Sequence, residues 1–170
     1  AGIETDLTVV CIEKNHFRII SSAAVRTHDK AHILKHLSKD VKFYDVTDEL
    51  ICLGVFGPKS RDMISKISKE NLSNKNFKFG TSKNLQLGSI IVWAQRLSYV
   101  GELGYELYIE RDLAKELFNT LVKSGAKYNL SLCGMHAMDI MRMESGFVHW
   151  GHDISPEENQ FEAGLSFAIS

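Results

Sequence analysis

Short apolar stretches of strand length occur in pairs along the sequence, and helical patterns follow most of these pairs. Runs or alternations of about four to eight residues are typical of strands, and apolar residues three or four positions apart are typical of helices. The expected strands are residues 7–12, 17–21, 41–46, 50–56, 89–97, 103–109 and 165–170. The expected helices begin near residues 27 and 58 and span residues 112–124 and 131–145. Strand pairs followed by helices predict an α+β fold with antiparallel sheets, not a doubly wound parallel sheet.

The length of the chain predicts one domain over residues 1–170, with two subdomains within it as the alternative. The chain has 170 residues, of which 44% are hydrophobic and 24% are charged. A chain of this size buries about 70% of its unfolded surface, so it forms a core without metals or disulfides. Residues 70–84 are polar and rich in Asn, Ser and Lys, so we expect an exposed loop or a short irregular link there. Because the first and last expected strands lie close to the two ends, we also expect a piece of a longer protein.

Charge and cysteine usage limit the partners. The net charge is -1 and the basic residues are spread along the chain, which argues against a nucleic-acid binder. The longest apolar run, residues 50–56, is too short to cross a bilayer. Cys11 and Cys52 lie in strand-like stretches, where we expect buried free thiols, and with Cys133 they make an odd number without a CxxC pair. A reducing compartment follows, which we take to be the bacterial cytoplasm, with the mitochondrial matrix as the alternative.

Three histidines repeat on one expected helix, at His28, His32 and His36. Three such positions span about 12 Å along a helix, too far for ligands of one metal ion. No HExxH motif accompanies them. We therefore interpret them as a solvated helix face and expect no metal site.

The stretch from Tyr99 to Ile109 is the most informative part of the sequence. Gly101 and Gly104 flank an acidic residue and predict a tight turn followed by a strand. Strand alternation places Glu106 on the face opposite its two apolar neighbours. A carboxylate that faces into a sheet is costly unless it is paired. Two interpretations remain open: an exposed glutamate of an edge strand, or a carboxylate that binds a ligand with two parallel N–H donors.

Four segments resemble one family, in the same order along the chain. Residues 99–106 are similar to the signature turn and strand of the folate-binding aminomethyltransferase (glycine cleavage T-protein) family. Other segments of that family are similar to residues 2–9, to residues 56–61, and to residues 139–146 followed by 150–153 and 162–165. The likeness covers nearly the whole chain. The segments Asp6-Leu7-Thr8-Val9 and His149-Trp150-Gly151 look more like the C-terminal folate domain of dimethylglycine and sarcosine dehydrogenases than like the free-standing T-protein.

The resemblance implies a fold, cofactors and roles for residues. It implies a T-protein-like folate-binding domain built from ferredoxin-like units, with tetrahydrofolate as cofactor and an FAD domain upstream in the same parent chain. Glu106 would accept the ring N–H and the amino group of the pterin, and Tyr99 would contact the cofactor. Asp6 would take a proton, or stabilise positive charge, as a folate nitrogen attacks an iminium carbon. The sequence departs from the T-protein branch at Met138, where that branch usually has an arginine, and at Thr5, where it has the first of two aspartates.

The function that the resemblance implies is folate-dependent one-carbon transfer. The chain would be the tetrahydrofolate-binding part of an FAD-dependent dehydrogenase of a dimethylglycine- or sarcosine-like methylamine, and would be inactive alone. The oxidised one-carbon unit would pass to tetrahydrofolate. One alternative is a free-standing aminomethyltransferase or folate-dependent demethylase. The other is a non-catalytic structural or docking domain with a vestigial folate site.

Overall fold

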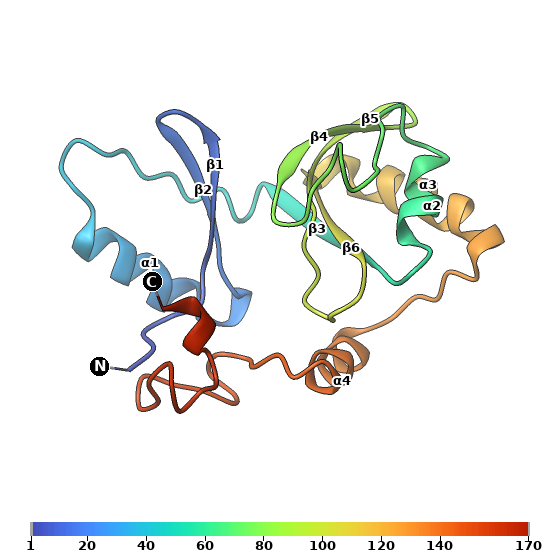
Figure 1. The fold of residues 1–170 in the computed structure, drawn as a ribbon. Coiled ribbons are helices and arrows are strands. Elements are labelled where there is room, and N and C mark those ends of the chain that lie inside the picture. Colours follow the sequence, from blue (N-terminus) through green and yellow to red (C-terminus); the bar gives the residue numbers. More distant parts are fainter. Residues whose placement is uncertain (1, 170) are drawn as a thin grey trace. The chain divides into compact units, whose positions relative to one another are not determined.

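The computed structural model describes residues 2–169, which form two compact units. The hairpin unit comprises residues 2–44 together with residues 148–169, and the sheet unit comprises residues 45–147. Figure 1 shows the elements of both units with their labels.

The hairpin unit is built on two antiparallel strands, β1 (Thr8–Glu13) and β2 (His16–Ile20). A 3-10 turn at Ala23–Val25 leads into α1 (Arg26–His36). The predicted hairpin and the helix that follows it are confirmed. The strand expected at residues 41–46 is wrong, because that stretch pairs with no other strand among the described residues.

The sheet unit contains a four-stranded antiparallel sheet in the order β3-β6-β5-β4. These strands are β3 (Leu50–Phe56), β4 (Ser82–Leu87), β5 (Ile90–Gln95) and β6 (Gly104–Glu110). The antiparallel pairing confirms the predicted α+β class. The helices of this unit are α2 (Ser60–Ser65), α3 (Ala114–Gly125) and α4 (Met135–Glu144).

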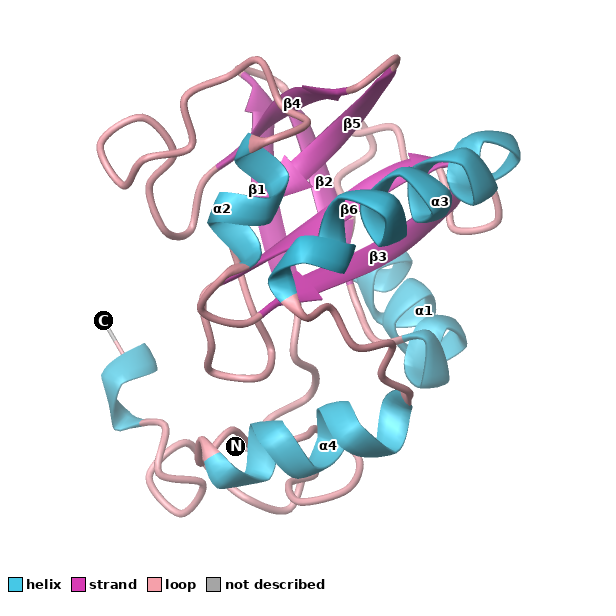
Figure 2. Cartoon of the chain, turned by 90° about the vertical axis from the view of Figure 1, so that its right-hand side faces the viewer, coloured by secondary structure: helices cyan, strands magenta, loops and turns pink. Residues whose placement is uncertain are grey.

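Helices α2 and α3 lie on the same side of this sheet, as Figure 2 shows. Alternate residues of the strands face these helices and are buried with them, because a sheet in water needs one covered apolar face. The core includes Val55, Leu85, Val92, Tyr105, Leu107 and Ile109 from the strands and Met63, Ile64, Leu117 and Leu121 from the helices. The other face of the sheet therefore carries the alternate set of side chains.

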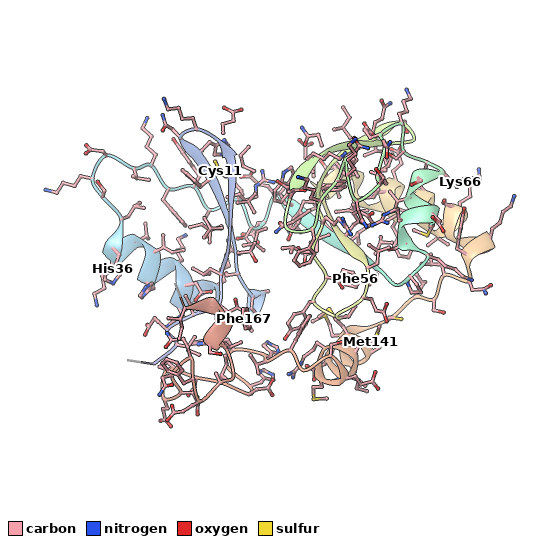
Figure 3. The ribbon with its side chains drawn as sticks, viewed as in Figure 1. Cys11, His36, Phe56, Lys66, Met141 and Phe167 are labelled. Carbon is pink, nitrogen blue, oxygen red and sulfur yellow. The ribbon has the colours of Figure 1, made fainter. Side chains whose placement is uncertain are left out.

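Three further expectations from the sequence are wrong in whole or in part. The polar stretch 70–84 is an irregular link up to residue 81, but it is not an exposed loop: β4 begins at Ser82, and Leu72 and Phe77 are buried in the core at 2% and 1% exposure. Cys11 and Cys52 are exposed, because strand alternation places them on the faces opposite their partly buried neighbours. Figure 3 labels Cys11 on its strand.

The C-terminal strand expected at residues 165–170 is also wrong for the described part. Residues Ser166–Ala168 form a 3-10 turn, and Ser170 lies outside the described residues. None of the helices that the structure describes has the length and the apolar character needed to span a bilayer.

Candidate functional site

The face of the four-stranded sheet opposite α2 and α3 holds the predicted carboxylate. Glu106 and Tyr108 of β6 lie on this face. The residues that alternate with them, Tyr105 and Leu107, are fully buried on the helix side. The residues in register with Glu106 and Tyr108 lie on the neighbouring strands β3 and β5. We call the whole set the Glu106 face: Cys52, Gly54, Trp93, Gln95, Glu106 and Tyr108. The predicted orientation of Glu106 is confirmed. The interpretation as an edge-strand glutamate is wrong, because β6 lies between β3 and β5.

Tyr108 is bonded to the Glu106 carboxylate. Its hydroxyl donates a hydrogen bond of 2.7 Å to Oε2 of Glu106, since residues two apart on a strand point to the same side. The Tyr108 ring packs against Trp93 of β5, with the ring centroids 5.0 Å apart. Burial, with Cys52 and Glu106 beside it, raises the pKa of Tyr108, so the hydroxyl keeps its proton and remains a donor.

Cys52 lies opposite Tyr108 on β3. Desolvation by the surrounding sheet residues, with the negative charge of Glu106, raises the pKa of the Cys52 thiol to about 12. At neutral pH this thiol is protonated and is a poor nucleophile. This arrangement therefore does not favour covalent catalysis by Cys52.

The residues opposite Glu106 are a glycine and a glutamine with an unused polar group. Gly54 of β3 has no side chain, and the ring of Phe56 occupies the space where a Cβ of Gly54 or Gly104 would lie. Figure 3 labels Phe56 at the end of its strand. On the other side, Gln95 is only 3% exposed, and its Oε1 has no hydrogen-bond partner among the described residues. A buried amide oxygen without a partner is unusual and marks a position where another polar group would be accommodated.

The turn that carries Tyr99 is fixed at both ends. Gly101 has a positive φ of 74°, which glycine adopts without strain. The carbonyl of Val100 accepts a hydrogen bond of 2.9 Å from the hydroxyl of Ser145, just after α4. The carbonyl of Leu103 accepts a bond of 2.8 Å from the Gly57 backbone N–H. Tyr99, which is half-buried, and Glu106 therefore belong to one well-connected turn and strand.

Asp6, the third predicted site residue, belongs to the hairpin unit. It is exposed, in the extended segment before β1. Its neighbour Thr5 donates a hydrogen bond of 2.6 Å to Oδ1 of Asp29 on α1. Asp29 is 1% exposed. The segment with Asp6 is thus tied to the helix through a buried carboxylate.

A histidine completes this attachment. Nδ1 of His28 lies 3.0 Å from Oδ1 of Asp29, and its Nε2 lies 3.3 Å from Oε1 of Glu4. Burial alone would raise the pKa of Asp29, but the hydrogen bonds from Thr5 and His28 outweigh it and hold that pKa below its usual value. The bond to Asp29 raises the pKa of His28.

The His28 ring also stacks on Trp150, with the centroids 5.3 Å apart. His28 is still exposed to solvent, with 39% of its side chain accessible, so the expected solvated helix face is confirmed at this residue although it is also paired and stacked. Within residues 2–169, no group of three or more histidine, cysteine, aspartate or glutamate side chains has an arrangement that could hold a metal ion.

Sequence reasoning missed three residues of these arrangements. Tyr108 had a readable signal, because its position two residues after Glu106 on a strand places both side chains on one face. Gln95 required the register between β5 and β6, which the sequence does not give. Asp29 had no signal, since an aspartate in the first turn of a helix is ordinarily solvated.

Comparison with known proteins shows which family the chain matches. The model of the GCVT N-terminal domain family matches residues 1–170. The chain is 37% identical to 4-methylaminobutanoate oxidase (formaldehyde-forming) of Paenarthrobacter nicotinovorans, over 100% of this chain and 21% of that protein. It is 35% identical to mitochondrial dimethylglycine dehydrogenase of Homo sapiens, over 98% of this chain and 20% of that protein. The chain thus spans about a fifth of the length of these curated relatives.

A solved structure supports the fold. The structure of glycine cleavage system aminomethyltransferase T from Bartonella henselae matches with a TM-score of 0.81 at 22% identity, over 100% of this chain and 44% of that one.

Proposed function

The chain belongs to the GCVT N-terminal domain family, and we propose that it is the tetrahydrofolate-binding part of an FAD-dependent methylamine dehydrogenase. The substrate class is a dimethylglycine- or sarcosine-like N-methylated amine. The oxidised one-carbon unit passes to tetrahydrofolate. Two relatives that match almost the whole chain, an oxidase of 4-methylaminobutanoate and a dehydrogenase of dimethylglycine, support this substrate class by their names.

The Glu106 carboxylate is the observation that carries the proposal. A pterin presents a ring N–H and an amino group side by side, and a carboxylate has two oxygens that accept such a pair. Of the residues in register with Glu106, Gln95 fits this edge, because it has an unused buried oxygen. Each hydrogen bond to the charged acceptor contributes about 1.5–3 kcal/mol, which is enough to fix the orientation of the ring.

When bound, tetrahydrofolate supplies the nitrogen that takes up the one-carbon unit. Glu106 and Tyr99 bind and orient it in the sheet unit. Asp6 takes a proton or stabilises positive charge during the transfer. The bond from Thr5 to the buried Asp29 holds the backbone segment on which Asp6 lies.

The rest of the activity belongs to a longer protein. We propose that an FAD domain upstream in the same chain oxidises the amine, and that the 170 residues alone have no dehydrogenase activity. The bacterial cytoplasm is the proposed compartment, with the mitochondrial matrix as the alternative. One competing function is a free-standing aminomethyltransferase, since aminomethyltransferase T shares the fold of this chain.

Calorimetric titration with 5-formyltetrahydrofolate tests the folate site. Glu106→Gln replaces one of the two acceptor oxygens by a donor, so we expect the affinity to fall about 10- to 100-fold. Tyr128→Phe is the matched control, because Tyr128 packs against the core beside α3, on the other side of the sheet. Equal affinity of wild type and Glu106→Gln would refute the site.

A further inference from the structure

Tyr108 constrains Glu106 more closely than any other residue on the Glu106 face. Its hydroxyl lies 2.7 Å from Oε2 of Glu106. Its own position is set by Trp93 on one neighbouring strand, at 5.0 Å between ring centroids, and by Cys52 on the other. A bulky aromatic ring held between two strands has few rotamers open to it.

The bond from Tyr108 matters because the last torsion of a glutamate is soft. A free carboxylate rotates broadly about that bond, and its two oxygens then point in no fixed direction. With Oε2 bonded to Tyr108, the carboxylate plane is fixed. Oε2 retains one lone pair and Oε1 retains its full capacity, so two acceptors remain for a ligand.

We propose that Tyr108 is a positioning residue that orients the Glu106 carboxylate for ligands with two parallel N–H donors. It thereby selects them over ligands that present one donor. The inference rests on the proposed folate-binding function of this face and adds to it the residue that sets its specificity. Tyr108 acts through Glu106 and need not touch the ligand.

Two ligands that differ in one donor test this role. The probes are 5-formyltetrahydrofolate and its analogue with the 2-amino group replaced by methyl. In the wild type we expect the amino compound to bind about tenfold or more tightly than the analogue, because it makes one more charged hydrogen bond. In Tyr108→Phe this preference falls to about threefold or less, while Tyr128→Phe keeps the wild-type ratio.

The ratio separates positioning from a structural role. General loosening of the sheet would weaken both compounds equally and leave their ratio at the wild-type value, and that result would overturn the inference. Glu106→Asp provides a second variant should Tyr108→Phe fail to fold: its carboxylate is one methylene shorter and loses the bond to Tyr108, so the same loss of preference is expected. A wild-type ratio in Glu106→Asp would also overturn the inference.

Failure of the proposed function has a different signature. If the wild type binds neither compound, the folate site itself is wrong and the inference falls with it. If the wild type binds and Glu106→Gln does not, but Tyr108→Phe keeps the full preference, only the role of Tyr108 is refuted.

Discussion

Gly101→Ala is expected to destabilise the sheet unit by two separate effects. Gly101 has a φ of 74°, and an L-residue with a Cβ pays about 1–2 kcal/mol in that region. A Cβ built at Gly101 would also collide with the side chain of Ser145. The serine hydroxyl must then move and lose its 2.9 Å bond to the Val100 carbonyl, which contributes about 1 kcal/mol. The combined loss is about 2–3 kcal/mol.

Urea unfolding followed by circular dichroism measures this loss. Gly146→Ala is the matched control, since Gly146 has a φ of 73° but no atom lies within 4 Å of its built Cβ. It should cost only the backbone part, about 1–2 kcal/mol. Ser145→Ala removes the colliding hydroxyl but keeps the Ser145 Cβ, 2.6 Å from the Cβ built at Gly101. Because Gly101→Ala alone already loses the bond to Val100, adding Ser145→Ala should cost little more. Gly101→Ala within about 0.5 kcal/mol of wild type, or full additivity with Ser145→Ala, would refute the reasoning.

Three further outcomes follow from single side chains. Gln95→Met removes a buried amide whose oxygen has no partner among the described residues, so thermal unfolding should show equal or higher stability, by up to about 1 kcal/mol; a clear loss would contradict this. Because its folded pKa is raised above 6.5, His28 stabilises the fold fully below pH 6.5 and progressively less as the pH rises through that raised pKa. His28→Gln should therefore lower the melting temperature at pH 6 and have little effect at pH 9; equal effects at both would exclude the charge pairing. All three cysteines are exposed, but burial and the charge of Glu106 raise the pKa of Cys52 to about 12. At pH 8 iodoacetamide should therefore label Cys52 much more slowly than Cys11 and Cys133. Equal labelling rates, measured by peptide mass spectrometry, would contradict this.

The sequence was sufficient where local pattern and tertiary pairing agree. The hairpin of β1 and β2 and the strands β3, β5 and β6 were predicted from apolar runs, and these runs are paired in the structure. The orientation of Glu106 followed from alternation alone. This part of the site is local, so a single strand determines it.

Prediction failed where pairing decides the structure. Residues Ser82–Leu87 have only two apolar side chains, yet they form β4 because β5 offers them a hydrogen-bonding edge. Residues 41–46 alternate well but pair with no strand among the described residues, so their pattern forms none. Asp29 is buried because Thr5 and His28 supply its hydrogen bonds. The contact with Thr5 joins residues 24 positions apart in the sequence, and composition and periodicity do not encode it.

The most direct test of the central claim is to locate bound folate on the protein by NMR. Backbone amide shifts of the isotope-labelled protein would be followed during titration with 5-formyltetrahydrofolate. We expect saturable shifts to concentrate on the Glu106 face, at Gly54, Gln95 and Tyr108, and in the turn at Tyr99. We expect Glu106→Gln to abolish them. Shifts confined to α2 and α3, or shifts that survive Glu106→Gln unchanged, would contradict it.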